Sequence, residues 1–370
     1  MVPGTPFASL TTLRLGGIAR CVLRITEPTD WRDIVKAVDV YNKGNKGTGP
    51  LMLGHGSNVI AADAGHPGPI VVMSTRGIAA QSVDENTINV TAQAGEPLTD
   101  LVQWAASERL AGLECLAGIP GTVGAAPVQN VGAYGQQIAD ILDHVTAWDW
   151  KTNRLRTLAV KACRLGYRRS RFKATASRWT ILTTTFHLTR SKFAAPVTYR
   201  HLAEELGVSV GTCAPTSEVV AAVLANRQRR GLLLDQHVPD ARQIGSVFLN
   251  PPVAAVEADH WAAKGCPVHT DTRGRQRVSA GWLLEYSGYR PGQRIIEGVH
   301  CSSRRTLTLV VCDNATSTGF VAALNKLTTH IRSACGVDLS VEPTRVGAWP
   351  PVGRRRIGEI NGRGRVRRGC

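Results

Sequence analysis

Several signatures of other protein classes are missing from this sequence. The nine cysteines are scattered and odd in number, and they form no C-x-x-C pair and no Cys/His cluster, which argues against a zinc site and against a disulfide framework. The chain opens without a basic segment followed by an apolar one, and no later segment offers 18 uninterrupted apolar residues. We therefore expect no metal and no membrane insertion, and we predict a soluble, cytosolic protein.

Three common motifs of nucleotide-binding and catalytic loops are missing as well. The glycine-rich stretch at 115–139 does not fit G-x-G-x-x-G, and no Lys-Ser/Thr pair follows it, so neither the usual dinucleotide fingerprint nor a Walker loop is present there. No G-x-S-x-G motif surrounds Ser246, which argues against a Ser-His-Asp nucleophile. A serine at this place can instead donate its hydroxyl proton to a developing carbanion.

Positive charge is unevenly distributed along the chain. The formal net charge is +16, and the last twenty residues alone hold seven arginines and one glutamate. We therefore expect a folded, mildly basic body that carries a disordered basic tail over residues 348–370. Such a tail could contact nucleic acid or another anionic surface.

Residues 115–139 contain no charged side chain, although the chain is strongly basic. Five glycines in this stretch would break a membrane-spanning helix and favour backbone laid close against a ligand. Successive N–H groups of residues 118–124 can then point into one concavity and bind phosphate without lysine. The turn at 54–58 (GHGSN) is a second place of this kind. For both stretches the alternative is a purely structural turn.

The rest of the pattern predicts strands and helices in three units. A linker at 190–197 separates an α+β layer from a compact α/β module. A cationic loop at 163–173 is either solvated surface or an anion-facing loop whose guanidinium stabilises a carboxylate or an enolate. Expected strands are 11–17, 51–53, 59–62, 70–72, 88–90, 145–150, 156–160, 179–188, 306–311 and 337–343; expected helices are 30–41 capped by Thr29, 97–112, one capped by Thr216, 280–284 and 318–336.

Six motifs, taken in order, resemble one family. They are LGHGSN (53–58), AGEPL (94–98), GLECLAGIPGTVGAAPVQNVGAYG (112–135), CRLGYRRSRFK (163–173), GSVFLNP (245–251) and AGWLLE (280–285). Together they closely resemble the bacterial UDP-N-acetylenolpyruvoylglucosamine reductases over residues 11–347. The resemblance omits the tail.

The resemblance implies an α+β flavoprotein of the vanillyl-alcohol-oxidase type. Its two-lobed FAD-binding domain would cover residues 1–70 and 71–195, and a C-terminal α/β substrate-binding domain would cover residues 196–347. The implied cofactors are FAD and NADPH, and the substrate is a UDP-sugar. The implied reaction reduces an enolpyruvyl ether to a lactyl ether, which gives UDP-N-acetylmuramate for peptidoglycan. A monomer is expected.

The resemblance also assigns roles to single residues. Arg168 matches the arginine of the family's G-Y-R-x-S motif and would hold the charge that builds toward the substrate carboxylate. Ser246 matches the serine of G-S-F-F-x-N-P and would donate the proton. Substrate-binding positions are matched by Tyr167, Tyr199, Arg227, Arg230 (in place of a lysine) and Asn250. The expected FAD-binding residues are Gly54, His55, Gly56, Ser57, Asn58, Gly118, Ile119, Pro120, Gly121, Thr122, Gly124, Ala125, Gln129, Asn130, Gly132, Ala133 and Tyr134.

Three positions depart from the family pattern. In the alignment that keeps E-P in place at residues 342–343, Thr344 occupies the position of the last catalytic residue, a glutamate. Because alternate residues of a strand share a face, Glu342 is expected about 7 Å from the usual site and would substitute only if the strand shifts. Arg169 replaces an acidic residue. His55 replaces Gly or Glu, and it could attach the flavin covalently.

These departures leave two alternative hypotheses beside an active reductase. The first is a flavin-binding paralogue with impaired or altered catalysis, motivated by Thr344 and the arginine-rich tail. The second is an oxygen-using flavin oxidase, whose reduced flavin would react with air faster than with the nucleotide.

Overall fold

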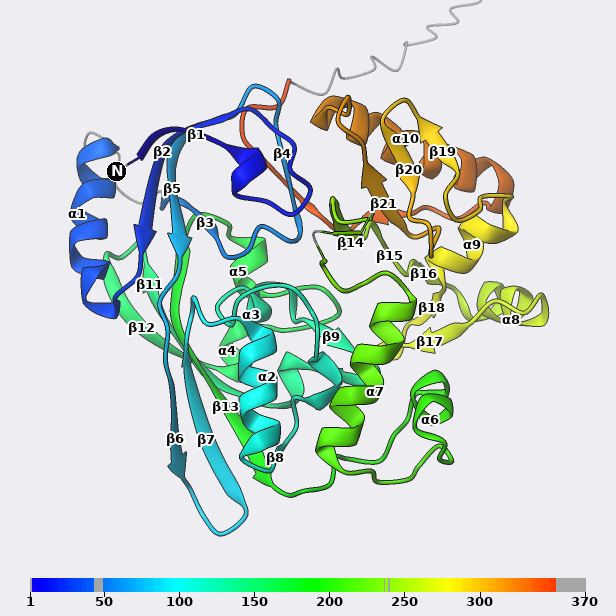
Figure 1. Cartoon of the computed structure of the whole chain (residues 1–370), viewed down its shortest axis with the longest axis horizontal. Helices are drawn as coiled ribbons and strands as arrows, with labels where there is room; N and C mark the ends of the chain where they lie inside the picture. Colours follow the sequence, from blue (N-terminus) through cyan, green and yellow to red (C-terminus); the bar gives the residue numbers. More distant parts are fainter. Residues whose placement is uncertain (1, 43–48, 236, 239, 351–370) are drawn as a thin grey trace, which may run out of the picture.

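The structure is a computed structural model of the chain, and it describes residues 2–42, 49–235, 237–238 and 240–350. Two lobes and a third domain follow one another along the chain (Figure 1). The predicted tail at 351–370 lies outside the described residues. No helix in the described part of the chain is long and apolar enough to span a membrane.

The first lobe is built on a four-stranded sheet with the order β1 (Val2–Pro6), β2 (Ile18–Ile25), β5 (His66–Met73) and β3 (Leu51–Leu53). Helix α1 (Trp31–Tyr41) buries residues 31, 34, 35 and 38, which is the spacing of one helical face. A short 3₁₀ helix, Pro28–Asp30, precedes α1, so Thr29 lies inside that turn and does not cap α1.

The expected strand at 11–17 is wrong. These residues form a turn, because the Thr11 hydroxyl donates to Phe7 O over 3.1 Å and Arg14 N donates to Thr11 O over 3.3 Å. Arg14 also adopts a positive φ of 55°, which lies outside the β region of a non-glycine residue.

The second lobe contains an antiparallel sheet. Its order is β12 (Arg154–Ala159), β11 (Leu142–Asp149), β13 (Trp179–Arg190), β7 (Thr87–Gln93) and β6 (Ile78–Ser82). Helix α2 (Leu98–Ser107) buries residues 98, 101, 102 and 105. The helix expected to reach residue 112 ends earlier, because Arg109 has φ 56° and Leu110 lies in β8 (Leu110–Ala111), which pairs with β13.

Two further helices share the core of the second lobe. Helices α6 (Arg200–Leu206) and α7 (Thr216–Arg229) contribute buried apolar side chains to the same cluster as the lobe sheet. Helix α7 lies beside α2 (Figure 1). Thr216 is the first residue of α7 and Pro215 is its N-cap. This packing favours a domain boundary after α7, while the predicted boundary at residue 196 stays a prediction.

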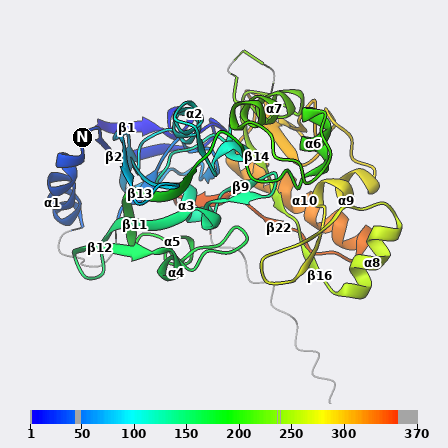
Figure 2. The same cartoon turned by 90° about the horizontal axis from the view of Figure 1, so that it is seen from below.

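The substrate-side domain is an α/β module. Its main sheet has the order β14 (Gln243–Ser246), β21 (Thr308–Val311), β20 (Val299–Cys301) and β19 (Arg294–Ile296). Helices α9 (Ala280–Tyr286) and α10 (Ser317–Cys335) pack in its core, and Gly336 ends α10 in the left-handed conformation, as predicted. Helix α8 (Ala255–Ala263) lies at the end of the molecule opposite α1 (Figure 2).

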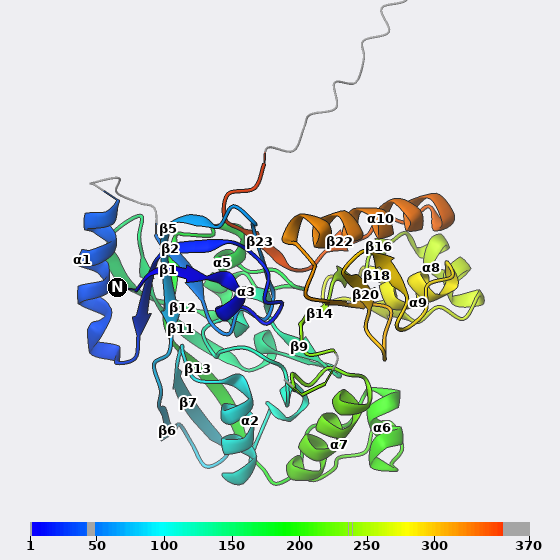
Figure 3. The ribbon, with the colours of Figure 1, turned by 45° about the horizontal axis from the view of Figure 1, so that its top comes forward.

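The chain finally returns to the first lobe. Strand β22 (Ser340–Val341) pairs with β15 (Phe248–Leu249) in the substrate-side domain, whereas β23 (Thr344–Val346) pairs in parallel with β4 (Val59–Ala61). Figure 3 shows this path from α10 back toward the first lobe. The single closing strand expected at 337–343 is therefore two short strands, with residues 342–343 between them. Asp63 adds to the junction by accepting the N–H groups of Ser317 and Thr318, both over 2.8 Å.

Candidate active site

All three units line one pocket of about 840 Å³. The first lobe contributes the turn at 54–58, and the second lobe contributes much of the uncharged stretch. The substrate-side domain contributes the end of β14, part of α9 and the turn before β21. The link between β22 and β23 also lines the pocket. The two loops in which the sequence predicts phosphate binding therefore lie in the same site.

These two loops touch because glycine allows it. A Cβ on Gly54 would lie 2.4 Å from Thr122 Oγ1, so only glycine permits this approach. The Ser57 hydroxyl donates to Pro120 O over 2.8 Å and joins the loops again. Gly121 has φ +150°. A Cβ built on it would lie in open space, with Ser57 Oγ as its nearest neighbour at 3.8 Å.

The loops also present hydrogen-bond donors to the pocket. Among the described residues, the N–H groups of Gly56, Ser57, Gly121 and Thr122 have no acceptor. Free N–H groups in such a concavity suit the phosphate groups of a dinucleotide cofactor. The residues present therefore fit FAD.

The predicted cofactor residues line this pocket with two exceptions. Gly118 is set behind the wall against Leu233 and Arg227. Asn130 is 2% exposed, and its side chain bonds to Gln137, Gly166 and Ala139, so it braces the wall instead of facing a ligand. The expectation that Asn130 binds the cofactor stays a prediction, and its side chain has protein partners in this structure.

Arg168 is held in a fixed orientation. Its Nη1 donates to Asn130 O over 3.2 Å and its Nη2 to Gly132 O over 2.9 Å. The residue has a positive φ of 52°, which is uncommon for a non-glycine residue and marks a conformation imposed by its surroundings. The uncharged stretch thus supplies the carbonyl groups that aim this guanidinium.

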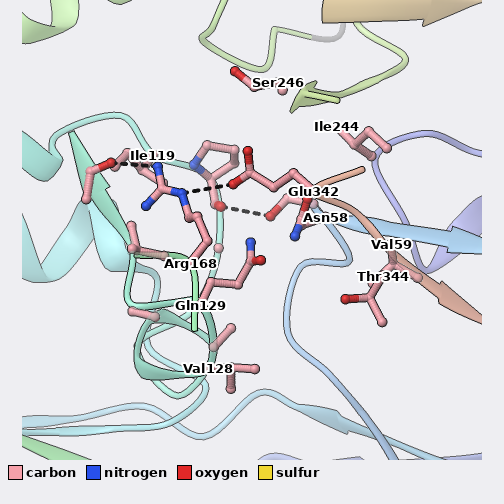
Figure 4. A pocket seen from close by; sticks show the side chains of 18 of the residues that line it. Asn58, Val59, Ile119, Val128, Gln129, Arg168, Ile244, Ser246, Glu342 and Thr344 are labelled. Atoms are coloured by element: carbon pink, nitrogen blue, oxygen red, sulfur yellow. Dashed lines mark hydrogen bonds and ion pairs between the residues drawn. The ribbon is translucent and has the colours of Figure 1, made fainter. Parts of the chain in front are cut away.

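Glu342 faces Arg168 from the link between β22 and β23. Its Oε1 lies 3.0 Å from Arg168 Nε, and the Glu342 side chain is only 13% exposed. Figure 4 shows this ion pair in the pocket, with Gln129 near it. Burial raises the pKa of Glu342 above its ordinary value, and the positive charges of Arg168 and Lys173 oppose this in part.

Glu342 lines the pocket from the link between the two short strands. The expectation that a shift was needed assumed one continuous strand, and the structure has a break at 342–343. Thr344 also lines the pocket, but it is exposed on β23, where its N–H donates to Asn58 O over 3.0 Å.

The predicted substrate residues surround the same pocket. Tyr167 OH accepts the Asn250 N–H at 3.4 Å, and the Arg277 guanidinium lies 4.1 Å from the Tyr167 ring centre. The Asn250 carboxamide oxygen accepts Ala280 N–H at 3.0 Å and so helps to begin α9. Tyr199 packs edge-on against Tyr134, with ring centres 5.7 Å apart.

Two predicted cations lie near the end of α7. Arg227 is 8% exposed, and its Nε has no hydrogen-bond partner among the described residues. Burial lowers the pKa of Arg227 to about 10. Arg230 caps the helix C-terminus and lines the pocket from an exposed position. A buried, incompletely paired guanidinium is suited to an anionic ligand.

Comparison with known proteins agrees with this geometry. Residues 22–158 match the family model for an FAD binding domain, and residues 236–346 match that of the UDP-N-acetylenolpyruvoylglucosamine reductase C-terminal domain. A UDP-N-acetylenolpyruvoylglucosamine reductase from Salinispora arenicola is 36% identical over 91% of this chain and 93% of its own. The enzyme of that name from Thermobifida fusca is 35% identical over 92% and 97%.

The chain belongs to the UDP-N-acetylenolpyruvoylglucosamine reductase family. A solved reductase structure from Thermus caldophilus superposes with a TM-score of 0.62 at 19% identity, covering 95% of this chain and 99% of that one. The fold class predicted from the sequence, a two-part FAD-binding domain with a C-terminal substrate-binding domain, is thereby confirmed. The expectation of an FAD-dependent oxidoreductase is confirmed at the level of the family.

Sequence reasoning missed three charged residues of this reductase-family pocket. Lys173 donates to Gln129 Oε1 over 2.7 Å, and Glu285 accepts the Thr306 hydroxyl over 3.1 Å. Arg305 Nη2 lies 3.3 Å from Ser246 Oγ. The sequence signal for Arg305 was the dipeptide Arg304-Arg305 ahead of an apolar strand. In the sequence alone this dipeptide resembles ordinary surface charge, because only the pairing of β21 with β14 brings Arg305 to the pocket.

The structure also locates His55 and Arg169, two of the residues that depart from the family pattern. His55 lies at the pocket wall as an exposed side chain. Arg169 exchanges backbone hydrogen bonds of 3.0 Å with Gly166 and so closes the turn that carries Arg168. Covalent flavin attachment through His55 stays a prediction.

Proposed function

We propose that this chain reduces the enolpyruvyl ether of UDP-N-acetylglucosamine enolpyruvate to a lactyl ether, which gives UDP-N-acetylmuramate. The proposal includes FAD as cofactor and NADPH as the hydride donor. The Arg168–Glu342 ion pair carries it, because this pair places an oriented guanidinium and a carboxylate in the pocket that the FAD-binding loops line. The names of the relatives, both UDP-N-acetylenolpyruvoylglucosamine reductases, support the same reaction.

The glycine loops would hold FAD. Gly56, Ser57, Gly121 and Thr122 offer free N–H groups, and the apolar side chains of Met73 and Leu98 add to the wall. When bound, FAD supplies the chemistry of accepting a hydride from NADPH and passing it to an electron-poor carbon.

Arg168 would stabilise negative charge on the substrate. An enolpyruvyl group is an alkene conjugated to a carboxylate, so hydride addition at one carbon moves negative charge toward the carboxylate. The two carbonyl contacts already orient the Arg168 guanidinium, so it needs no reorganisation when that charge develops. Glu342 holds the third side of the guanidinium through Nε.

Ser246 would supply the proton. It ends β14 and faces the pocket from the substrate-side domain, on a different unit from Arg168 (Figure 4). An unactivated hydroxyl is adequate, because a carbanion is a much stronger base than an alkoxide. Arg227 and Arg230 would bind the diphosphate of the UDP-sugar.

The half-reactions test this proposal directly. We expect anaerobic NADPH to bleach the flavin and the enolpyruvyl nucleotide then to restore its colour. A flavin that bleaches and is not reoxidised by the nucleotide would contradict the proposal and support a paralogue with altered catalysis. Reoxidation by air faster than by the nucleotide would support an oxidase.

The finer features of this function are part of the proposal. They are the preference for NADPH over NADH, a cytoplasmic location and a monomeric state. Titration of the bleaching rate with each nicotinamide nucleotide checks the first, and sedimentation of the purified protein checks the last.

A further inference from the structure

Arg305 contacts the proposed proton donor from the turn that precedes the opposite strand, β21. Its Nη2 lies 3.3 Å from Ser246 Oγ. Ser246 pairs with Thr308 across the β14–β21 ladder, and Val247 N donates to Leu307 O over 3.0 Å. The backbone of the sheet therefore fixes the register of Arg305 against Ser246.

The turn that carries Arg305 is anchored by a buried carboxylate. Asp240 is 7% exposed and accepts the Ser302 hydroxyl over 2.6 Å. It also accepts the Ser303 N–H and the Ser303 hydroxyl, both over 3.0 Å. Asp240 is thus satisfied by the turn itself and holds Arg305 at a defined point of the pocket wall.

No carboxylate of the described residues forms a close ion pair with Arg305, although the charges of Glu285 and Glu342 act on it from farther away. Burial lowers its pKa to about 10, and the positive charges of Arg230 and Arg227 add to this effect. Arg305 still carries its charge near neutral pH. A charged guanidinium that has no close ion-pair partner can stabilise negative charge that forms beside it.

We infer that Arg305 is a positioning residue for Ser246: it directs the hydroxyl proton to the substrate and stabilises the alkoxide left behind. A guanidinium only donates hydrogen bonds, so Ser246 Oγ must be the acceptor in this contact. The one hydroxyl proton of Ser246 is then left for the substrate carbon. This inference rests on the proposed function.

The proton transfer from Ser246 conserves atoms and electrons. The O–H bond of Ser246 breaks, and the electron pair of the substrate carbanion forms the new C–H bond. Negative charge moves to Oγ, next to the Arg305 guanidinium. The alkoxide then takes a proton from water and the serine is restored.

Arg305→Gln tests the inference without NADPH. The bound flavin is reduced with dithionite and mixed anaerobically with the enolpyruvyl nucleotide, and reoxidation is followed by absorbance. We expect reoxidation to slow about 100-fold, the cost of removing one oxyanion donor, while nucleotide affinity stays within about threefold. Because proton transfer becomes slower, the solvent deuterium isotope effect on reoxidation should increase in the variant.

Two further variants provide a rescue and a control for this experiment. Arg305→Lys keeps the positive charge and should recover part of the reoxidation rate. If Arg305→Gln does not retain flavin, the reoxidation rate of Arg305→Lys is compared with that of the wild type instead. Arg294→Gln removes an exposed arginine from β19 of the same sheet and should match the wild type. Equal reoxidation rates for Arg305→Gln and wild type would overturn the inference.

A double-mutant cycle separates positioning from a general structural effect. In a Ser246→Ala background, Arg305→Gln should cause no further loss, because both changes remove the same proton-transfer unit. Losses that multiply would show that Arg305 acts independently of Ser246, which would also overturn the inference. A wild type that is not reoxidised by the nucleotide would instead contradict the proposed function itself.

Discussion

The carboxylate of Glu342 lies 3.0 Å from Nε of Arg168 and joins the link between β22 and β23 to the second lobe. Arg168 sits in a loop that the uncharged stretch holds, and Glu342 sits where the chain leaves the substrate-side domain for the first lobe. The pair therefore links all three units of the structure.

Glu342→Gln should slow reoxidation of reduced flavin by the enolpyruvyl nucleotide about 100-fold or more, because the Arg168 guanidinium loses its charged partner. Bleaching by NADPH should continue. Stopped-flow absorbance measures both steps, and Asp338→Asn, on an exposed surface pair, is the control. A large gain in turnover from Thr344→Glu would contradict this assignment and place the missing carboxylate at residue 344.

The stability of the protein should depend on pH through Glu342. Burial raises the pKa of this carboxyl in the folded state, so the folded protein binds the proton more tightly than the unfolded chain does. The stabilisation is complete below the ordinary glutamate pKa and is lost as the pH rises through the raised value. Urea unfolding should therefore show the free energy of wild type, relative to Glu342→Gln, falling as the pH increases toward neutrality. A flat difference would contradict the prediction.

Gly54→Ala should weaken FAD binding strongly. The new Cβ would lie 2.4 Å from Thr122 Oγ1, so the two glycine loops must separate. Flavin content after gel filtration measures the effect. Gly68→Ala is the matched control, because its Cβ would meet only the movable His66 side chain, at 3.2 Å. Thr122→Ala in the Gly54→Ala background should restore part of the FAD binding. If Gly68→Ala and this double variant both bind as little FAD as Gly54→Ala does, the contact between Gly54 and Thr122 does not explain the loss.

Asp149 should stabilise the second lobe at neutral pH. Hydrogen bonds from Arg178, both of 2.9 Å, lower the pKa of Asp149 to about 2. Asp149→Asn should cost about 1–2 kcal/mol of unfolding free energy at pH 7, after allowance for solvent screening. The difference from wild type should shrink as the pH falls from about 4 toward 2, where the carboxylate is protonated. Asp33→Asn, in an exposed ion pair with Lys36, should show neither effect.

The sequence predicted those parts of the fold that depend on local pattern. The apolar spacing of α1 and α10 and the glycine after α10 are local signals, and the structure confirms them. The uncharged stretch was identified as a ligand wall because glycine has a conformational meaning that does not need a partner. The turn at 11–17 was missed, because a positive φ at Arg14 leaves no mark in an alternating apolar pattern.

The parts of the site that depend on long-range pairing could not be predicted. The break between β22 and β23 arises because each strand pairs with a different unit, and nothing near residue 342 indicates that. The orientation of Glu342 and the contact of Arg305 with Ser246 both follow from such pairings. The family resemblance was therefore sufficient to propose Ser246 and Arg168 as site residues, but not to predict the partners that hold them.

The pairing of β23 with β4 has a consequence for biosynthesis. Residues 59–61 leave the ribosome long before their partner strand, which brings Val346 into the core of the first lobe. A nascent chain therefore carries two lobes whose pocket still lacks the wall that holds Glu342. A premature stop codon even a few residues before position 342 would remove the carboxylate and leave β4 as an unpaired edge, so a late truncation should be as damaging as an early one.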